Sequence, residues 1–177
     1  FNGGSQLAAD GIAANAVLVT NIAATAGALI WLTIEWFIVK KPTLIGMASG
    51  AVSGLVGITP ASGFVDASGA LAIGIISGIV GYWGVVHLKS MIKHDDTLDA
   101  FGIHGLVGIA GALLTGIFAN PEVNGGAGLL YGNPIQVWVQ LKAVLITIAY
   151  SAVATFVVWK VCELITRGGR VDEELEL

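Results

Sequence analysis

The stretch that decides the fold is residues 98–119, LDAFGIHGLVGIAGALLTGIFA, a run of apolar and small residues with one acid near its start and one histidine, His104. A helix needs about 20 residues to cross about 30 Å of hydrocarbon, and this stretch is long enough. Asn120 and Pro121 follow it directly and are typical of a helix end. We therefore predict a transmembrane helix here.

Four further apolar stretches have the same character. The second of the five is short, rich in glycine and ends at Pro60, whereas the last is the longest and is expected to tilt or to extend past the bilayer. The connections are short except at 120–134, so neither a second domain nor a flexible linker is predicted. The predicted spans are residues 12–39, 43–59, 67–88, 98–119 and 135–165.

Composition supports a membrane protein. Hydrophobic residues make up 55% of the chain and charged residues 11%, with a mean hydropathy of +0.85, whereas about 25% of a soluble domain is charged. The 25 glycines show no triplet period, which excludes collagen. No basic patch suggests nucleic acid, and a single cysteine allows no internal disulfide. We predict an all-α integral membrane protein with about five transmembrane helices in a single membrane domain, residues 1–177.

The basic residues of the connections predict the topology. If five helices alternate in direction, these residues all fall on one side, which the positive-inside rule makes cytoplasmic. The N-terminus is then outside, and residues 167–177 form a short cytoplasmic tail. Asp10 is expected to cap the first helix. The basic residues are Lys40, Lys41, Lys89, Lys93, Arg167 and Arg170.

Small residues recur at four-residue spacing in three of the predicted helices. They favour close helix packing, and they also leave room for a narrow pore. The two interpretations are compatible. The positions are Gly46, Gly50 and Gly54, then Gly74 and Gly78, then Gly108 and Ala112.

His104 is the most informative side chain. Ionisable residues at membrane depth are costly and usually face a cavity or a partner. Gly102, Gly105 and Gly108 flank the ring and are expected to leave space beside it. A histidine packed against a neighbouring helix and a histidine on a transport pathway are equally consistent with this spacing. No second His or Cys lies within ligand spacing, so neither a metal nor a cofactor is predicted.

The acids before this helix have a simpler interpretation. Asp99 precedes His104 by five residues, which in an α-helix places the two about 140° apart, so Asp99 is not expected to orient the ring. Asp95, Asp96 and Asp99 cluster where the helix begins, and capping of its positive end is the favoured role.

The chain begins with an aromatic ring and small polar residues, Phe1, Asn2 and Ser5. An aromatic face attracts a cation by about 0.5–2 kcal/mol, and a hydroxyl adds a hydrogen-bond acceptor. Such residues are also common at membrane edges. The sequence has no serine-histidine-aspartate arrangement in a hydrolase context, no phosphate-binding loop and no paired carboxylates at membrane depth, so an enzyme is not predicted.

Three stretches together carry a resemblance. They are FNGGS at 1–5, SGAVSGLV at 49–56 with ITPA at 58–61, and DDTLDAFGIHG at 95–105 with LTGIF at 114–118. In this order the chain resembles the ammonium transporter family (Amt/Mep, distantly Rh) along essentially its whole length.

The resemblance implies an architecture. Family members have eleven transmembrane helices, in which two five-helix halves are related by inverted symmetry and a long eleventh helix follows. This chain resembles the end of helix six through helix eleven, so on its own it is expected to lack a complete pore. The family also implies a homotrimer in the plasma membrane, with the lipid bilayer around it and a PII-type cytoplasmic protein as a regulator.

The resemblance also implies residue roles. Phe1 matches one of two stacked phenylalanines at the outer mouth, and Ser5 matches a hydroxyl that helps to bind ammonium there. His104 matches one of two histidines that share a proton in the pore. Further residues are expected near the pathway: Asn2, Thr59, Asp99, Gly102 and Gly105.

Transport of ammonium or ammonia is the function that the resemblance implies. One alternative is an ammonium sensor built on the same fold, which would need a fused cytoplasmic domain. Another is a structural half-bundle that needs a partner chain. The chain opens at Phe1 rather than Met and reads as the interior of a longer protein, so the coding sequence upstream of Phe1 tests the last alternative.

The predicted topology can be tested by thiol labelling of intact cells, with Cys162 replaced by serine. We expect Asn124→Cys to react with an impermeant reagent from outside and Ser90→Cys to stay unlabelled until the cells are opened. The reverse pattern would overturn the orientation.

Overall fold

The computed structural model describes residues 1–92 and 96–166, and the regular secondary structure of these residues is entirely helical, as predicted. Lys93, Asp95 and the expected tail at 167–177, with Arg167 and Arg170, lie outside the described residues. The elements are η1 (Gly4–Gln6), α1 (Gly11–Ile38), α2 (Leu44–Ile58), α3 (Ala67–Trp83), η2 (Gly84–Leu88), α4 (Lys89–Ile92), η3 (Phe101–Leu106), α5 (Val107–Phe118), α6 (Pro121–Asn124), η4 (Leu129–Tyr131) and α7 (Ile135–Thr166).

Five apolar helices match the predicted spans. Among the described residues, four are long and apolar enough to cross a membrane: Gly11–Ile38, Ala67–Met91, Phe101–Phe118 and Ile135–Thr166. The remaining helix, α2, has 15 residues and is the short, glycine-rich span predicted at 43–59. The chain is therefore a multi-pass membrane protein.

The predicted and observed helices differ at the end of the third span, which reaches Met91 rather than Leu88, and at the start of the fourth. The prediction began at Leu98, but Asp99 has a φ of 55°, a left-handed conformation that interrupts a right-handed helix. The regular segment consequently begins at Phe101.

Contacts divide the chain into two compact units, residues 1–141 and a unit that begins at Lys142. The first contains α1 to α6 and every predicted site residue. The described part of the second is the remainder of α7. Within it, the Lys160 ammonium lies 2.7 Å from a Glu163 carboxylate oxygen and 4.6 Å from the centre of the Trp159 ring.

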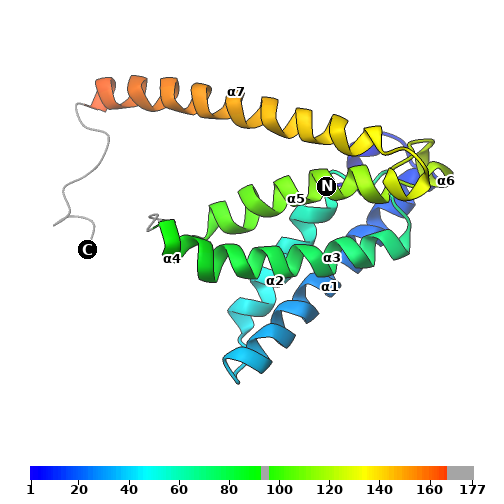
Figure 1. Ribbon diagram of the computed structural model, residues 1–177, viewed down its shortest axis with the longest axis horizontal. Helices are drawn as coiled ribbons and strands as arrows, with labels where there is room; N and C mark the ends of the chain where they lie inside the picture. Colours follow the sequence, from blue (N-terminus) through cyan, green and yellow to red (C-terminus); the bar gives the residue numbers. More distant parts are fainter. Residues whose placement is uncertain (93–95, 167–177) are drawn as a thin grey trace. The chain divides into compact units, whose positions relative to one another are not determined.

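In the first unit, α1 packs against α2 and α3 through glycine, and Figure 1 shows α1 and α2 side by side. A Cβ at Gly54 would contact the carbonyl oxygen of Ala23, and one at Gly74 would lie 2.7 Å from the Ala23 Cα. Gly50 and Gly78 meet the backbone of Gly27 in the same way. The predicted close packing of small residues is thus confirmed for the glycines of α2 and α3.

A compact apolar core lies where the same helices meet α5. Val19 and Ala23 of α1, Ile58 of α2 and Ile73 of α3 are completely buried in it, and Leu114 joins them from α5. The core therefore ties the predicted fourth helix to the first three.

Side chains cap the helices at both ends of the bundle. The carboxylate of Asp10 accepts a hydrogen bond from the amide of Ala13 at 2.9 Å, which confirms the predicted cap of α1. At the opposite end of α1, the Glu35 carboxylate accepts bonds from the Thr43 amide at 2.7 Å and from the Trp31 indole at 3.2 Å. Glu35 therefore closes the turn that leads into α2.

Asp66 joins two loops at the end of the bundle where α3 begins. Its carboxylate accepts hydrogen bonds from the Gly69 amide at 2.8 Å, the Ser68 hydroxyl at 2.7 Å and the Asn120 side chain at 3.1 Å. These bonds, with that from Gly69 the strongest, hold the pKa of Asp66 below its usual value. The Asn120 amide also donates to the Phe64 carbonyl at 2.7 Å, so the loops after α2 and α5 are held together.

The glycine packing makes a prediction about stability. In Gly54→Ala the new methyl meets a carbonyl oxygen that belongs to backbone, so the helices must separate, and we expect a loss of about 1–3 kcal/mol in the free energy of unfolding. Thermal unfolding in detergent measures it. Gly11→Ala is the matched control, because a Cβ there meets nothing within 4 Å. Equal melting temperatures would contradict the packing argument.

Candidate functional site

Four of the five residues predicted on a substrate pathway line one recess in the first unit. The recess has a volume of about 330 Å³ and is open along one side. The N-terminal segment, α1, α2 and η3 contribute to it. Its lining residues are Phe1, Asn2, Thr20, Val52, Leu55, Val56, Thr59 and His104.

One face of α2 forms the long wall of the recess. Val52, Leu55, Val56 and Thr59 follow the spacing i, i+3, i+4 and i+7, which places them on a single helix face. The glycines of α2 lie on the other side, where Gly54 packs on α1. The packing of α2 on α1 therefore turns this apolar face toward the recess.

His104 lies in a π-helical segment, η3, at the start of the span that continues as α5. Such segments are rare and occur often at functional sites. The ring is exposed in the recess, and it makes no hydrogen bond with any residue that the structure describes. Both ring nitrogens are therefore available to a ligand.

The glycines around His104 have different surroundings from those expected. Gly102 packs on a neighbouring backbone, with a Cβ position 3.1 Å from the nitrogen of Val85, and the ring of Phe101 covers Gly105. Gly108 is the most open of the three, with Val56 of the recess at 3.9 Å. The expected space beside the imidazole therefore comes from the recess and from Gly108.

The Asp99 side chain forms its ion pair away from His104, and no hydrogen bond joins these two described residues. Its carboxylate lies 2.7 Å from the Lys89 ammonium. Asp96, in contrast, accepts hydrogen bonds from the amides of Ala100 and Phe101, both at 2.9 Å. The predicted capping role is thus confirmed for Asp96, whereas Asp99 forms an ion pair.

The N-terminal segment is held against α1. The Asn2 side-chain amide donates to the Thr20 hydroxyl oxygen at 3.0 Å. Ser5 is outside the recess lining, and its hydroxyl donates to the carbonyl of Phe1 at 3.0 Å. The ring of Phe1 is almost fully exposed in this chain. Ser5 therefore stabilises the turn that carries Phe1.

The chemistry of the lining favours a small neutral molecule. Among its residues His104 is the only titratable side chain, and the others are apolar or neutral and polar. A neutral imidazole offers one donor and one acceptor nitrogen. The recess can therefore hold an uncharged hydrogen-bonding molecule and can exchange a proton at one point.

Sequence reasoning missed Thr20 and the apolar face of α2. Thr20 stands within a long apolar helix, and a hydroxyl there is a weak signal because it can bond to its own helix. The i, i+3, i+4, i+7 spacing on α2 is present in the sequence. The glycines at 46, 50 and 54 give a stronger pattern, and that pattern lies on the opposite face of the helix.

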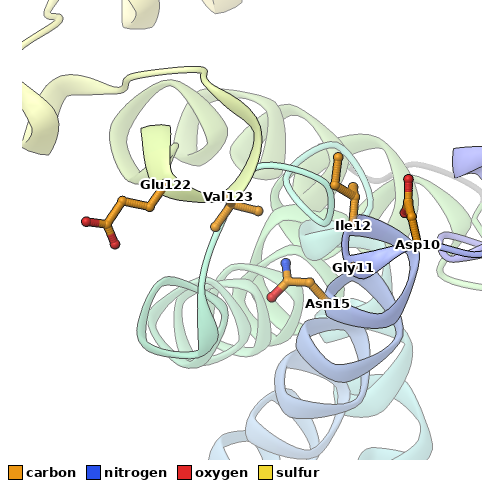
Figure 2. A pocket seen from close by; sticks show the side chains of 6 residues that line it. All are labelled: Asp10, Gly11, Ile12, Asn15, Glu122 and Val123. Atoms are coloured by element: carbon orange, nitrogen blue, oxygen red, sulfur yellow. The ribbon is translucent and has the colours of Figure 1, made fainter.

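A second recess, of about 470 Å³, lies between the start of α1 and α6. Figure 2 shows that its two acids do not converge, because the carboxylate of Glu122 points away from Asp10. The side-chain amide of Asn15 donates a hydrogen bond to the carbonyl of Val65 at 3.0 Å. This recess therefore lacks the converging groups of a binding site.

The bond between Asn2 and Thr20 can be tested on its own. We expect Thr20→Val to reduce the free energy of unfolding by about 1 kcal/mol, because the amide of Asn2 loses its partner. Thr33→Val in the same helix is the control, since the Thr33 hydroxyl bonds only to the Leu29 carbonyl of its own helix. Melting temperatures of the two variants in detergent would contradict the argument if they were equal.

Known proteins are similar to this chain in sequence and in fold. An ammonium transporter of Aquifex aeolicus is 50% identical over 177 residues, which are 100% of this chain and 42% of that protein. The crystal structure of Saccharomyces cerevisiae Mep2 is similar to this chain, with a TM-score of 0.90 and 36% sequence identity. The match covers 97% of this chain and 40% of the Mep2 chain. A solved structure named Sensor Amt Protein is also similar, with a TM-score of 0.84 and 27% sequence identity. That match covers 98% of this chain and 42% of the sensor chain.

The chain thus spans less than half the length of the relatives that it matches. The family model named Ammonium Transporter Family matches residues 1–177, from the first residue to the last. The sequence resemblance is confirmed, and the chain belongs to the ammonium transporter family.

Proposed function

We propose that this chain forms one half of a pathway that carries ammonium across the plasma membrane as ammonia and a separately handled proton. The observation that carries the proposal is the recess in which Phe1, Asn2, Thr59 and His104 meet. The names of the relatives support the substrate, since they are ammonium transporters.

The lining supports passage of the neutral molecule. Moving an unpaired ion into a medium of low dielectric costs tens of kcal/mol before compensation. The recess offers no opposite charge, because its described lining contains no Asp or Glu. Ammonia needs only hydrogen bonds, and His104 can supply one at each ring nitrogen.

Each site residue has a part in this proposal. Phe1 offers an aromatic face to the cation at the outer mouth, where Ser5 fixes its turn. His104 accepts or returns the proton. Thr59, whose hydroxyl donates to the Leu55 carbonyl at 2.7 Å, keeps an oxygen available as an acceptor beside the recess.

The wider assembly follows the family. We propose a homotrimer with the N-terminus of this chain outside and its C-terminus in the cytoplasm, with regulation by a PII-type protein. The segregation of basic residues in the sequence supports the orientation.

A sensor is the second candidate, and the likeness to the structure named Sensor Amt Protein favours it. A sensor would bind ammonium without net transport. Measured current in the complete protein therefore separates the two functions.

The role of His104 is tested in the complete reading frame that contains this chain. We expect His104→Ala to assemble normally and to reduce the current after an ammonium jump on supported membranes by about tenfold or more, because proton transfer by a positioned side chain is worth about 10²–10⁴-fold in rate. Size exclusion checks assembly.

The control for this experiment is a second histidine. His87 lies on η2, outside the recess lining and beside the ring of Tyr82, so His87→Ala should keep the current. A wild-type current with unaltered cation selectivity in His104→Ala would return His104 to a packing role.

A further inference from the structure

The segment that carries His104 packs on a second π-helical segment. These are η3 and η2, and η2 follows α3 directly. They meet at two glycines, because a Cβ at Gly84 would lie 3.1 Å from the Cα of Gly102. Gly102 and its neighbour Ile103 are buried. The backbone immediately before His104 is therefore fixed laterally by η2.

An ion pair joins the residues that flank these two segments at the end of the bundle. Lys89 directly follows η2, and Asp99 lies two residues before η3. The ammonium and the carboxylate are 2.7 Å apart, and their side chains are 35% and 31% exposed. Asp99 adopts its left-handed backbone conformation here, which only a few residue types tolerate.

The start of η3 is also held through its amides. Asp96 accepts bonds from Ala100 and Phe101. Desolvation alone would raise the pKa of Asp96. Hydrogen bonds from the Phe101, Ala100 and Gly102 amides and the attraction of the Lys89 ammonium outweigh it and leave the pKa below its usual value. The capping bonds hold the amides, whereas the pair with Lys89 holds Asp99 to the other segment.

Register is what such a connection controls. In a π-helical segment the hydrogen bonds run from residue i to i+5, one residue more than in an α-helix. If one residue moved from the π-helical segment into the adjoining α-helix, or the reverse, the side chains on the far side of that boundary would rotate by about 100° about the helix axis. A rotation of that size would turn the His104 ring out of the recess.

We propose that Lys89, through its ion pair with Asp99, is a positioning residue that holds the π-helical segment in the register that presents His104 to the recess. The inference rests on the proposed function of His104. The proposed role of Lys89 is to position His104 and not to stabilise the fold, since partly exposed ion pairs add little to the free energy of unfolding. The pair Lys160–Glu163, also 2.7 Å apart, joins residues of a single helix and provides the comparison.

The test uses the complete reading frame and four variants: Lys89→Met, Lys89→Arg, Asp99→Asn and Lys160→Met. Asn tolerates the left-handed conformation of Asp99, so Asp99→Asn removes the charge alone. The first readout is the rate at which diethyl pyrocarbonate modifies His104, followed by peptide mass spectrometry. The second is ammonium transport, with the maximal rate and the half-saturating concentration measured separately at equal amounts of assembled protein.

We expect Lys89→Met to change the modification rate of His104 by about threefold, within the range that a partly exposed ion pair can shift an equilibrium. The maximal transport rate should fall while the half-saturating concentration stays constant. Asp99→Asn should change both readouts as Lys89→Met does. Lys89→Arg should keep both at the wild-type level, and Lys160→Met should leave both unchanged.

Unchanged reactivity of His104 in Lys89→Met would overturn the inference, as would an equal change in Lys160→Met. If Lys89→Met fails to assemble, Asp99→Asn decides: a changed His104 modification rate supports the positioning role and an unchanged rate refutes it. If His104→Ala transports normally, the proposed function fails, yet the modification rates still decide whether Lys89 positions the ring.

Discussion

The close approach of α1 to α2 and α3 is the contact on which the rest of the first unit depends. Lipid tails are as apolar as leucine, so these helices gain little by burying large side chains against one another. They gain from dispersion and from backbone proximity instead, and both require that Cβ atoms be missing where Ala23 meets Gly54 and Gly74. Because this contact orients α2, it also determines that Val52 and Val56 face outward and form the wall of a recess.

The spans, the Asp10 cap and the glycine packing were predictable because each has a local cause. Length and hydropathy identify a membrane helix, and small residues four apart identify a close-packed face. The two π-helical segments and the left-handed Asp99 were not predictable, because an i→i+5 hydrogen bond leaves no composition signature. The Lys89–Asp99 pair was missed for a related reason, since it depends on how the chain returns between two helices.

The site was predictable in part, and chiefly through family motifs. Spacing alone left His104 divided between a packing role and a pathway role. The recess adds that Phe1, Asn2 and Thr59 lie on the same surface as the ring. The Ser5 hydroxyl donates to the Phe1 carbonyl, and its predicted part in binding ammonium stays a prediction. Thr20 could be found only once Asn2 was seen to donate to it.

The distribution of charge along the bundle connects the fold to the chemistry. Charged side chains gather at its two ends: Asp10 and Asp66 cap helices at one, and Lys89 pairs with Asp99 at the other. Between them the described lining of the recess carries no fixed charge. On the proposed pathway, a cation at this recess would have to lose either its charge or most of its hydration energy, and loss of the charge is the less costly. Under the proposed function, the His104 ring exposed in the wall of the recess would take that proton, and its position in the recess is what the proposal requires.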